Sequence, residues 1–395
     1  MGEPKEIPNN YKDYKHQDGE EVPNPRLALH VESSSSKLLE KLESQLRKVS
    51  NLDDVSVYTG SSGIALLYFM LGNKVNPSYY DKALTVIKQA FPLLKKRRVS
   101  FLNGDAGPLA LGAVLNFRLG DNKSAAKLVA KLTGSLLHEA LDSRVPDEIL
   151  YGRAGYLYSL LFVNKHMGRD TVPVSTIRNV ITAILNSGKE LALHEHVRCP
   201  LMYQWHEKHY LGAAHGIAGI LFMLLQAREY VSKSDMDKLI LPTIDYVESL
   251  QFTSGNFPSS LETNKDKLVQ WCHGAPGMVD LFSLAYHIFR KESYLTTALK
   301  CGELVWKRGI LKKGYSICHG VSGNAYTFLR LYQETHDLKH LHRAYQFADW
   351  CTEYGKYQSH PPDRPLSMFE GIAGVVYFLI DIQHPNTAVF PAYVL

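Results

Sequence analysis

The sequence predicts an all-α protein of the α/α toroid class, a double-layered, seven-fold helical barrel with seven inner and seven outer helices. The first observation is a G-x-x-G motif that recurs at a spacing of about fifty residues, which is typical of a repeat architecture. The second is that apolar segments follow the motif, and the third is that amphipathic segments separate one motif from the next. The copies of the motif are Gly60–Gly63, Gly104–Gly107, Gly152–Gly155, Gly216–Gly219, Gly274–Gly277, Gly320–Gly323 and Gly371–Gly374.

The segments that follow the motif predict the inner helices. IALLYFML follows Gly63, YLYSLLFV follows Gly155 and ILFMLLQA follows Gly219. Each is apolar on nearly every side, as expected of a helix that is buried all round. Few segments of the chain alternate with a period of two, so we expect strands to be rare.

The segments between the motifs predict the outer helices. In Ser36–Leu52, the side chains of Leu38, Leu39, Leu42 and Leu46 share one helical face, and charged side chains occupy the rest. Repeats of this kind stack into solenoids or closed rings. No repeat has an obviously polar capping face, which favours closure. The seven G-x-x-G loops of a closed ring gather at one end, where a site would be built.

The domain organisation follows from the same pattern. The first residues are rich in proline, and the run Ser33–Ser36 precedes the first amphipathic segment. We therefore expect residues 1–35 to form a loosely ordered N-terminal arm and residues 36–395 to form a single domain.

Composition excludes several classes of protein. The chain has 395 residues, of which 45% are hydrophobic, so global disorder is not expected. A net charge of only +5 gives no support for binding nucleic acid. Five cysteines are too few for a secreted disulfide framework, and the N-terminus has no apolar signal segment. We expect a cytoplasmic protein with at most peripheral membrane association, the nucleus and the plasma-membrane surface being the alternatives.

Two of the motifs carry a Cys-His pair. Trp271–Gly277 reads WCHGAPG and Ile317–Gly323 reads ICHGVSG, so the two cysteines occupy the same place in neighbouring repeats. A buried cysteine is usually a small packing residue, but duplication in register with the repeat favours a metal site. Two thiolates and one imidazole would form a Cys2His zinc site with an open fourth position, which is the catalytic type. The spacing alone leaves open whether His273 or His319 supplies the imidazole.

Such a zinc ion would suit a substrate sulfur, because a thiol bound to it would be a thiolate at neutral pH. A papain-like nucleophile is disfavoured, since such a nucleophile would not need to be duplicated one repeat later. The remaining cysteines have neither a histidine neighbour nor a G-x-x-G context, and we expect them to be packing residues: Cys199, Cys301 and Cys351.

The chain resembles the eukaryotic LanC-like proteins, relatives of the bacterial lanthionine cyclases. The resemblance is carried by W-C-H-G-A-P-G, G-Y-S-I-C-H-G-V-S-G-N-A-Y and A-A-H-G-I-A-G, and it extends from I-P-N-N-Y-K-D-Y near the start to S-M-F-E-G-I-A-G near the end. It implies an α/α toroid with one zinc ion held by Cys272, Cys318 and His319, and it leaves His273 beside the open position. It also implies glutathione as co-substrate, added to dehydroalanine or dehydrobutyrine residues of peptides or proteins.

The resemblance also suggests the acid–base residues. His215, in the AAHG loop of the fourth repeat, matches the histidine that would protonate the enolate formed by thiol addition. Glu148 stands where the cyclases have a catalytic acid and would orient a partner or relay a proton. We include His273 as a third catalytic candidate. Without the resemblance, His215 and Glu148 would each be read as structural residues.

Glutathione carries two carboxylates, so cations are expected near the metal. The positions that match contacts of the family are Lys5, Lys313, His360, Pro361, Pro362 and Asp363. His360 and Lys5 depart from the family pattern, which commonly has arginine at both places, and neither can form the bidentate fork of a guanidinium. We expect the neighbouring Lys307, Arg308 and Lys312 to be solvated.

Other functions are compatible with parts of the sequence. A non-catalytic adaptor that binds zinc and glutathione and recruits signalling proteins is the main alternative. A prenyltransferase subunit would normally add a carboxylate to the zinc ligands. A carbohydrate-processing toroid would need paired carboxylates, for which Asp105, Glu148 and Glu370 are available. The basic run Lys95–Arg98 resembles a kinase site or nuclear signal, but we interpret it as the solvated end of an outer helix.

Overall fold

The computed structural model describes residues 5–16, 21–49, 53–95, 98–357 and 361–395. These residues fall into two compact units. The first unit comprises Met1–Asn51, Gln251–Ser259 and Thr263–Pro391, and the second comprises Leu52–Leu250, Ser260–Glu262 and Ala392–Leu395. Over the described ranges the regular structure is helical apart from three isolated β-bridges, which confirms the expected all-α class.

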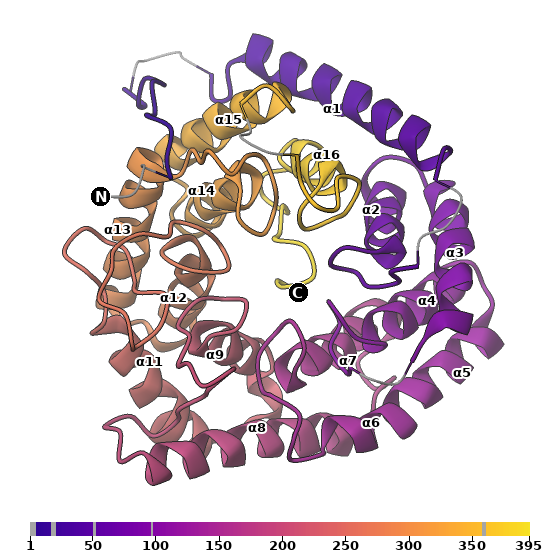
Figure 1. Cartoon of the computed structure of the whole chain (residues 1–395), viewed down its shortest axis with the longest axis vertical. Helices are drawn as coiled ribbons and strands as arrows, with labels where there is room; N and C mark the ends of the chain where they lie inside the picture. The colour runs from indigo at the N-terminus through magenta and orange to yellow at the C-terminus, as the bar shows by residue number, and fades with distance from the viewer. Residues whose placement is uncertain (1–4, 17–20, 50–52, 96–97, 358–360) are drawn as a thin grey trace. The chain divides into compact units, whose positions relative to one another are not determined.

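The second unit carries the helices of the first four repeats (Figure 1). They are α2 (Ser61–Lys74), α3 (Tyr79–Ala90), α4 (Ala106–Arg118), α5 (Asn122–Thr133), α6 (Ser135–Ala140), α7 (Arg153–Met167), α8 (Val174–His194), α9 (Ile217–Gln226), α10 (Lys233–Asp235) and α11 (Leu241–Glu248). Short 3-10 turns at Phe91–Leu93 and Arg228–Tyr230 and a π turn at Met236–Ile240 complete it.

The first unit carries the last three repeats and the N-terminal segment. Its helices are α1 (Pro25–Leu46), α12 (Pro276–Phe289), α13 (Glu292–Arg308), α14 (Val321–Thr335), α15 (Leu338–Thr352) and α16 (Ile372–Asp381).

The helices of each unit form two layers. Helices that begin within a G-x-x-G motif, such as α2, α4, α7 and α9, are buried on nearly every side. Each of the first three packs against an amphipathic partner, in the pairs α2–α3, α4–α5 and α7–α8. In the first unit α12 pairs with α13 and α14 with α15, while α1 packs against α16 (Figure 1). This confirms the expected alternation of apolar inner and amphipathic outer helices.

Helix α1 begins earlier than we expected. It starts at Pro25 rather than Ser36, because Asn24 caps its first turn by accepting a hydrogen bond from the Arg26 amide, and Pro25 suits the first helical position. The serine run lies inside the helix, where Ser35 is buried. The expectation of irregular structure up to residue 35 was therefore wrong for this stretch, whereas the single domain over 36–395 stays a prediction.

The chain before α1 is hydrogen-bonded to the last repeats of the same unit. The Ile7 amide donates to the Ile310 carbonyl at 2.8 Å, and the Lys312 amide donates to the Lys5 carbonyl at 2.9 Å. Farther along, the guanidinium of Arg343, which is 1% exposed, binds the carboxylate of Asp13. The described part of the arm is thus held by both backbone bonds and a buried cation.

The second glycine of the motif permits a close backbone approach. A Cβ atom on Gly323 would lie 1.8 Å from the Ile317 carbonyl oxygen, and one on Gly374 would lie 2.0 Å from that of Met368. Only glycine therefore lets the loop that precedes each helix fold back over the helix start. In the first unit this loop carries the candidate metal ligands.

One buried carboxyl predicts a measurable pH dependence of stability. Burial raises the pKa of Asp280 in α12 to about 6, and Arg330 offsets part of that rise. The folded protein therefore binds this proton more strongly than the unfolded chain, and the associated stability is lost as pH rises from about 4 to about 6. Asp280→Asn, which stays neutral, is expected to gain on the order of 2 kcal/mol over wild type between these limits. Thermal midpoints of both proteins at about pH 4.5 and about pH 7.5 test this, and an unchanged difference would contradict it.

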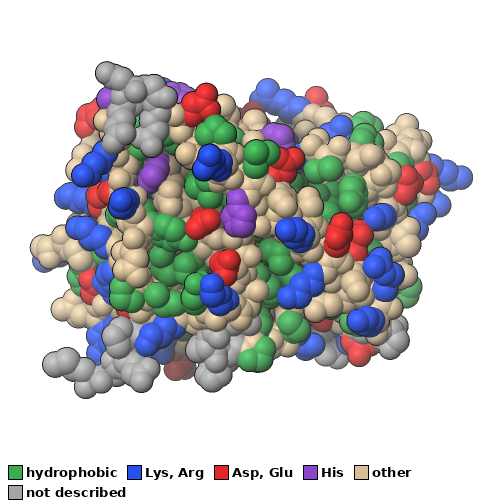
Figure 2. Space-filling model, turned by 90° about the horizontal axis from the view of Figure 1, so that it is seen from above, with side chains coloured by type: hydrophobic (Ala, Val, Ile, Leu, Met, Phe, Trp, Pro, Cys, Tyr) green, Lys and Arg blue, Asp and Glu red, His purple; other side chains and the backbone are tan. Residues whose placement is uncertain are grey.

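The surface carries both signs of charge. On the described part of the face in Figure 2, basic and acidic side chains are interspersed, with hydrophobic side chains between them. Among the described residues, no helix has the length and apolar character needed to cross a membrane.

Candidate functional site

The three metal ligands that the resemblance implies lie together in the first unit. The ligand atoms of Cys272, Cys318 and His319 all lie within 4.8 Å of one another. Cys272 is in the loop before α12, and Cys318 and His319 are in the loop before α14. Both cysteines are buried, at 8% and 3% exposure, while His319 is half-buried. The repeat register therefore brings these side chains into one group.

Backbone hydrogen bonds hold the loops of three successive repeats together at this point. The Cys272 amide donates to the Cys318 carbonyl at 3.4 Å, and the Cys318 amide donates to the Phe369 carbonyl at 3.0 Å. The side-chain amide of Asn324, at the start of α14, donates to the Val269 and Gly309 carbonyls, each at 2.9 Å. The backbone positions of the two cysteines are consequently fixed by main-chain hydrogen bonds between the loops.

The electrostatics of the group call for a cation. The hydrogen bond with Cys272, together with burial, raises the pKa of the Cys318 thiol well above its ordinary value, and His319 acts in the opposite direction. Two thiolates so close together in a buried place repel each other unless a positive charge lies between them. Two sulfur atoms and one imidazole nitrogen are a donor set that suits zinc, so the residues present fit this ion.

The two candidate histidines behave differently. His319 belongs to the group, whereas His273 is outside it among the described residues. His273 instead forms a tight backbone turn with Gln270, in which each amide donates to the other's carbonyl, at 3.0 and 3.2 Å. Cys272 lies within this turn. The backbone hydrogen bonds of His273 therefore help to position Cys272, one of the candidate metal ligands. Its catalytic role stays a prediction.

Of the predicted glutathione-binding residues, Lys5 lies on the arm, and Lys313 lies on the loop between α13 and α14 that also carries Cys318 and His319. Lys5 is joined by its carbonyl to Lys312, the neighbour of Lys313, and the side chains of Lys5 and Lys313 are both exposed. Arg308 was expected to be solvated, and that was wrong. It is 28% exposed and pairs with Glu6 at 2.8 Å and Asp266 at 2.7 Å, which ties the arm to the end of α13 and to the segment before α12.

The other predicted contacts follow α15. Pro361 and Asp363 are exposed and Pro362 is half-buried, while His360 lies outside the described residues. Burial raises the pKa of Glu370, with Asp363 acting in the same direction and Lys313 and Arg364 opposing it. Lys313, Asp363, Arg364 and Glu370 thus form one cluster of mixed charge in the first unit.

The predicted acid–base pair is formed in the second unit. His215 Nδ1 lies 2.8 Å from Glu148 Oε2, and Glu148 is only 2% exposed. The same carboxylate accepts hydrogen bonds from the backbone amides of Leu150 at 2.9 Å and Tyr151 at 2.5 Å. An acceptor held by two amides favours the imidazole tautomer with its proton on Nδ1, and it fixes the orientation of the ring.

Three aromatic rings lie close to His215. The rings of Tyr151 and Trp205 are both tilted by 14° to the imidazole, with centroids 6.0 and 6.2 Å away, and Tyr210 lies at 5.9 Å. Sequence reasoning missed Tyr151 and Trp205.

A signal for some of these residues was present in the motif. The position directly before each G-x-x-G holds every histidine of the candidate metal and acid–base sites. The seven residues at this position are Thr59, Asn103, Tyr151, His215, His273, His319 and Glu370. Read as a set, this position would have identified Tyr151 and Glu370 as neighbours of the site residues. Trp205 had no such signal, since it lies in the loop between α8 and α9.

Comparisons with known proteins agree with this picture. A family model described as Lanthionine synthetase C-like protein matches residues 51–395. Glutathione S-transferase LANCL1 of Danio rerio is 42% identical over 371 residues, covering 93% of this chain and 91% of the relative. LanC-like protein GCL1 of Arabidopsis thaliana is 37% identical over 311 residues, covering 75% of this chain and 70% of the relative.

Among solved structures, nisin cyclase is similar with a TM-score of 0.65 at 19% identity. The likeness covers 92% of this chain and 95% of that one. At this level of identity the likeness shows the fold alone, and it confirms the α/α toroid expected from the repeats.

Proposed function

Because the chain belongs to the lanthionine synthetase C-like family, we propose that it is a zinc-dependent glutathione transferase that adds the glutathione thiol to dehydroalanine and dehydrobutyrine residues of peptides or proteins. The observation that carries the proposal is the group formed by the buried thiols of Cys272 and Cys318 and the half-buried imidazole of His319. Glutathione transfer is supported by the name of the Danio rerio relative, which is similar over nearly the whole chain.

The donor set explains why a thiol would be the substrate. A zinc ion held by two thiolates and an imidazole would lower the pKa of a further thiol bound at its open position, and so supply a thiolate at neutral pH. Cys272 and Cys318 need only remain in place for this, and the main-chain bonds from Cys272 to Cys318 and from Cys318 to Phe369 hold them there.

The reaction balances without an oxidant or a reductant. The sulfur forms a bond to the β-carbon of the unsaturated residue, and the electrons of the carbon–carbon double bond move toward the carbonyl to give an enolate. His215 then delivers a proton to the α-carbon. The proton that leaves the glutathione thiol restores the histidine, so the net change is the addition of S–H across the double bond.

Glu148 would support this step by holding the imidazole. Its carboxylate accepts a hydrogen bond from the Nδ1–H group of His215 and stabilises the positive charge that the ring carries when both nitrogens are protonated. This leaves Nε2 as the nitrogen that exchanges the proton with substrate. His273, in the turn around Cys272, is proposed as an additional catalytic residue.

We propose that the mixed-charge cluster and the arm recognise glutathione. The tripeptide carries two carboxylates and one ammonium group. Lys313 and Lys5 would bind carboxylates, and Asp363 would bind the ammonium, with Pro361 and Pro362 shaping that side of the site. We propose His360 as a further contact. The backbone bond between Lys5 and Lys312 supports the idea that arm and loop act together.

The experiment is a direct assay of thioether formation. The zinc-loaded protein is incubated with glutathione and a dehydroalanine peptide, and the adduct is followed by mass spectrometry against the uncatalysed reaction. We expect the protein to accelerate addition. If it binds zinc and glutathione but leaves the rate at the uncatalysed level, the transferase proposal is wrong and the chain is a non-catalytic glutathione-binding adaptor.

The thiols also bear on where the protein works. All five cysteines are free, and all are buried. We propose a cytoplasmic location, where a reducing environment keeps the metal-binding thiols from oxidation.

A further inference from the structure

The second unit contains a pocket that the proposed chemistry does not yet use. It is a cavity of about 590 Å³ whose lining includes Arg98, Glu139, Asp142, Arg144, Tyr151 and Trp205. This volume is in the range of pockets that hold small ligands or peptide side chains. Two of its walls, Tyr151 and Trp205, are rings that lie beside His215. The pocket therefore adjoins the proposed proton donor within the same unit.

One wall of the pocket is rigid. The loop between α6 and α7 is held by Arg153, which is only 4% exposed. Its guanidinium donates to the Ala140 carbonyl at 3.0 Å, the Asp142 carbonyl at 2.6 Å and the Asp147 carboxylate at 2.7 Å. Three bonds from one buried cation keep the loop in a fixed shape, so the pocket is formed before any ligand arrives.

The opposite wall is presented by an unusual turn. Trp205 and Lys208 exchange backbone hydrogen bonds at 3.0 and 3.2 Å around His206 and Glu207. Both of these residues have left-handed backbone angles, with φ of 48° and 58°, which Asn and Gly adopt far more readily. The turn therefore holds the half-exposed Trp205 ring stacked on Tyr151, with centroids 5.7 Å apart.

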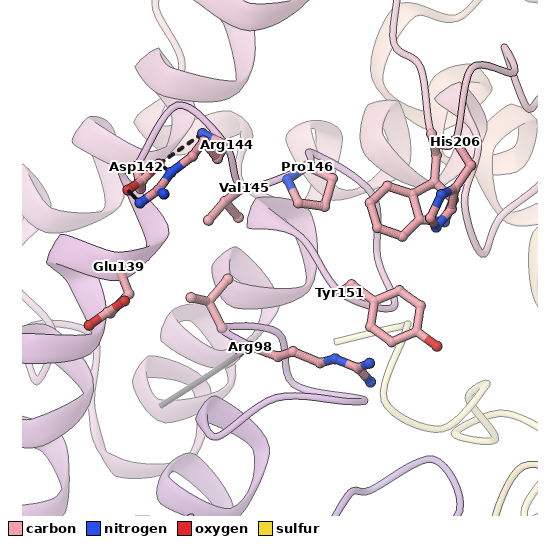
Figure 3. A pocket seen from close by; sticks show the side chains of 10 residues that line it. Arg98, Glu139, Asp142, Arg144, Val145, Pro146, Tyr151 and His206 are labelled. Carbon is pink, nitrogen blue, oxygen red and sulfur yellow. Dashed lines mark hydrogen bonds and ion pairs between the residues drawn. The ribbon is translucent and has the colours of Figure 1, made fainter. Parts of the chain in front are cut away.

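The charges of the lining are divided between two sides. Figure 3 shows Glu139, Asp142 and Arg144 on one side and Arg98 with Tyr151 on the other. Asp142 and Arg144 neutralise each other through two hydrogen bonds, at 2.7 and 2.9 Å. Glu139 thus remains as the acidic group on one side of the pocket, and Arg98 is the cation on the other side.

Arg98 is the cation without a carboxylate partner among the described residues. Its guanidinium lies over the Tyr151 ring, 4.6 Å from the centroid, and its carbonyl accepts a hydrogen bond from the Asp105 amide. A cation–π contact of this kind leaves the N–H donors of the guanidinium available to an anion. This residue ends the basic run that we interpreted as the end of an outer helix, yet α3 ends at Ala90 and Arg98 lies in the following loop.

We propose that this pocket binds an acidic side chain of the peptide that carries the unsaturated residue. Arg98 binds the carboxylate, and Tyr151 and Trp205 form the surface on which the peptide lies. The inference rests on the proposed transferase function, since it assigns a specificity to that site. It predicts that unsaturated residues with a nearby aspartate or glutamate are preferred over those in a neutral sequence.

Binding can be tested separately from catalysis. In the unreactive test peptide, alanine replaces the unsaturated residue and aspartates flank it, and a matched peptide has asparagines instead. Intrinsic fluorescence is a suitable readout, because the other three tryptophans are only 1%, 7% and 6% exposed: Trp271, Trp306 and Trp350. We expect the aspartate peptide to change the fluorescence of wild type and to leave that of Trp205→Phe unchanged.

Arg98→Met removes the charge and keeps the length of the side chain. We expect it to weaken binding of the aspartate peptide about tenfold and to leave little difference between the two peptides. The matched control is Arg178→Met, which removes the same charge from an exposed position on α8 of the same unit. Equal affinity of Arg98→Met and wild type for the aspartate peptide, or a fluorescence change that persists without Trp205, would overturn the proposal.

Catalysis provides the second arm. With dehydroalanine in place of alanine, the ratio of kcat/KM for the aspartate and asparagine peptides is expected to be about ten in wild type and in Arg178→Met, and about one in Arg98→Met. If wild type accelerates both peptides equally, the specificity is wrong while the transferase function stands. If wild type accelerates neither, the transferase function fails, and the fluorescence titration then decides whether the pocket binds acidic peptides at all.

Discussion

Cys318→Ala is expected to lose its zinc and, with it, glutathione addition. The side chain supplies one of three ligand atoms that lie within 4.8 Å of one another, and removal leaves a buried thiol and an imidazole that cannot close the site. We expect metal affinity to fall by more than about a hundredfold, since even residues that only orient metal ligands are commonly worth ten- to a hundredfold. Metal content per chain, measured after dialysis, gives the result directly.

The matched control for this variant is Cys301→Ala. That thiol is also buried, in α13, and its sulfur accepts a hydrogen bond from the side-chain amide of Gln251 at 3.5 Å. It is not part of the metal group. It is expected to retain about one zinc ion per chain. Circular dichroism of both variants separates loss of metal from loss of fold. A Cys318→Ala protein that lacks zinc yet adds glutathione at the wild-type rate would refute the mechanism.

His215→Asn is expected to lower kcat for glutathione addition by about a hundred- to a thousandfold. Asparagine can still bind Glu148, but it cannot deliver a proton to the α-carbon. Zinc content and glutathione affinity should stay at wild-type values, because neither depends on this side chain in the proposed mechanism. Steady-state kinetics combined with metal analysis and a glutathione titration measure all three quantities.

Glu148→Gln separates the role of Glu148 from that of His215. It keeps the shape of the side chain and removes the charge that stabilises the protonated imidazole, so we expect a smaller fall in kcat than for His215→Asn. The double variant should be no slower than His215→Asn alone, because Glu148 acts through the histidine. An unchanged kcat in His215→Asn would exclude this residue as the proton donor.

The fold could be predicted from the sequence because the backbone of each repeat requires glycine at a fixed place. A Cβ atom on Gly323 or Gly374 would strike the carbonyl of the preceding loop, so the glycines mark the start of buried helices in the sequence itself. The register of Cys272 and Cys318 is a consequence of the same repeat, which is why the spacing of the motifs was enough to place both thiols together.

Features that depend on side chains distant in the sequence were less predictable. The repeat gave His273 and His319 equivalent places, so no local pattern could separate them. The family resemblance implied His319, and the structure brings that histidine to the thiols. Arg308 was expected to be solvated because its partners, Glu6 and Asp266, lie in segments that no local pattern connects to it. Arg98 was assigned to a helix end for the same reason, since Tyr151 belongs to another repeat.

The attachment of the arm has a consequence for how the protein is made. Glu6 pairs with Arg308 across 302 residues of sequence, and the first unit joins the beginning of the chain to its last repeats. During synthesis, the opening segment therefore waits for its partners until most of the chain has left the ribosome, which at ordinary rates of translation takes roughly 15 to 60 seconds. The second unit, whose residues between Leu52 and Leu250 are nearly contiguous, can fold meanwhile. A chain truncated before residue 308 would consequently leave Lys5 and Glu6 without their partners, Lys312 and Arg308.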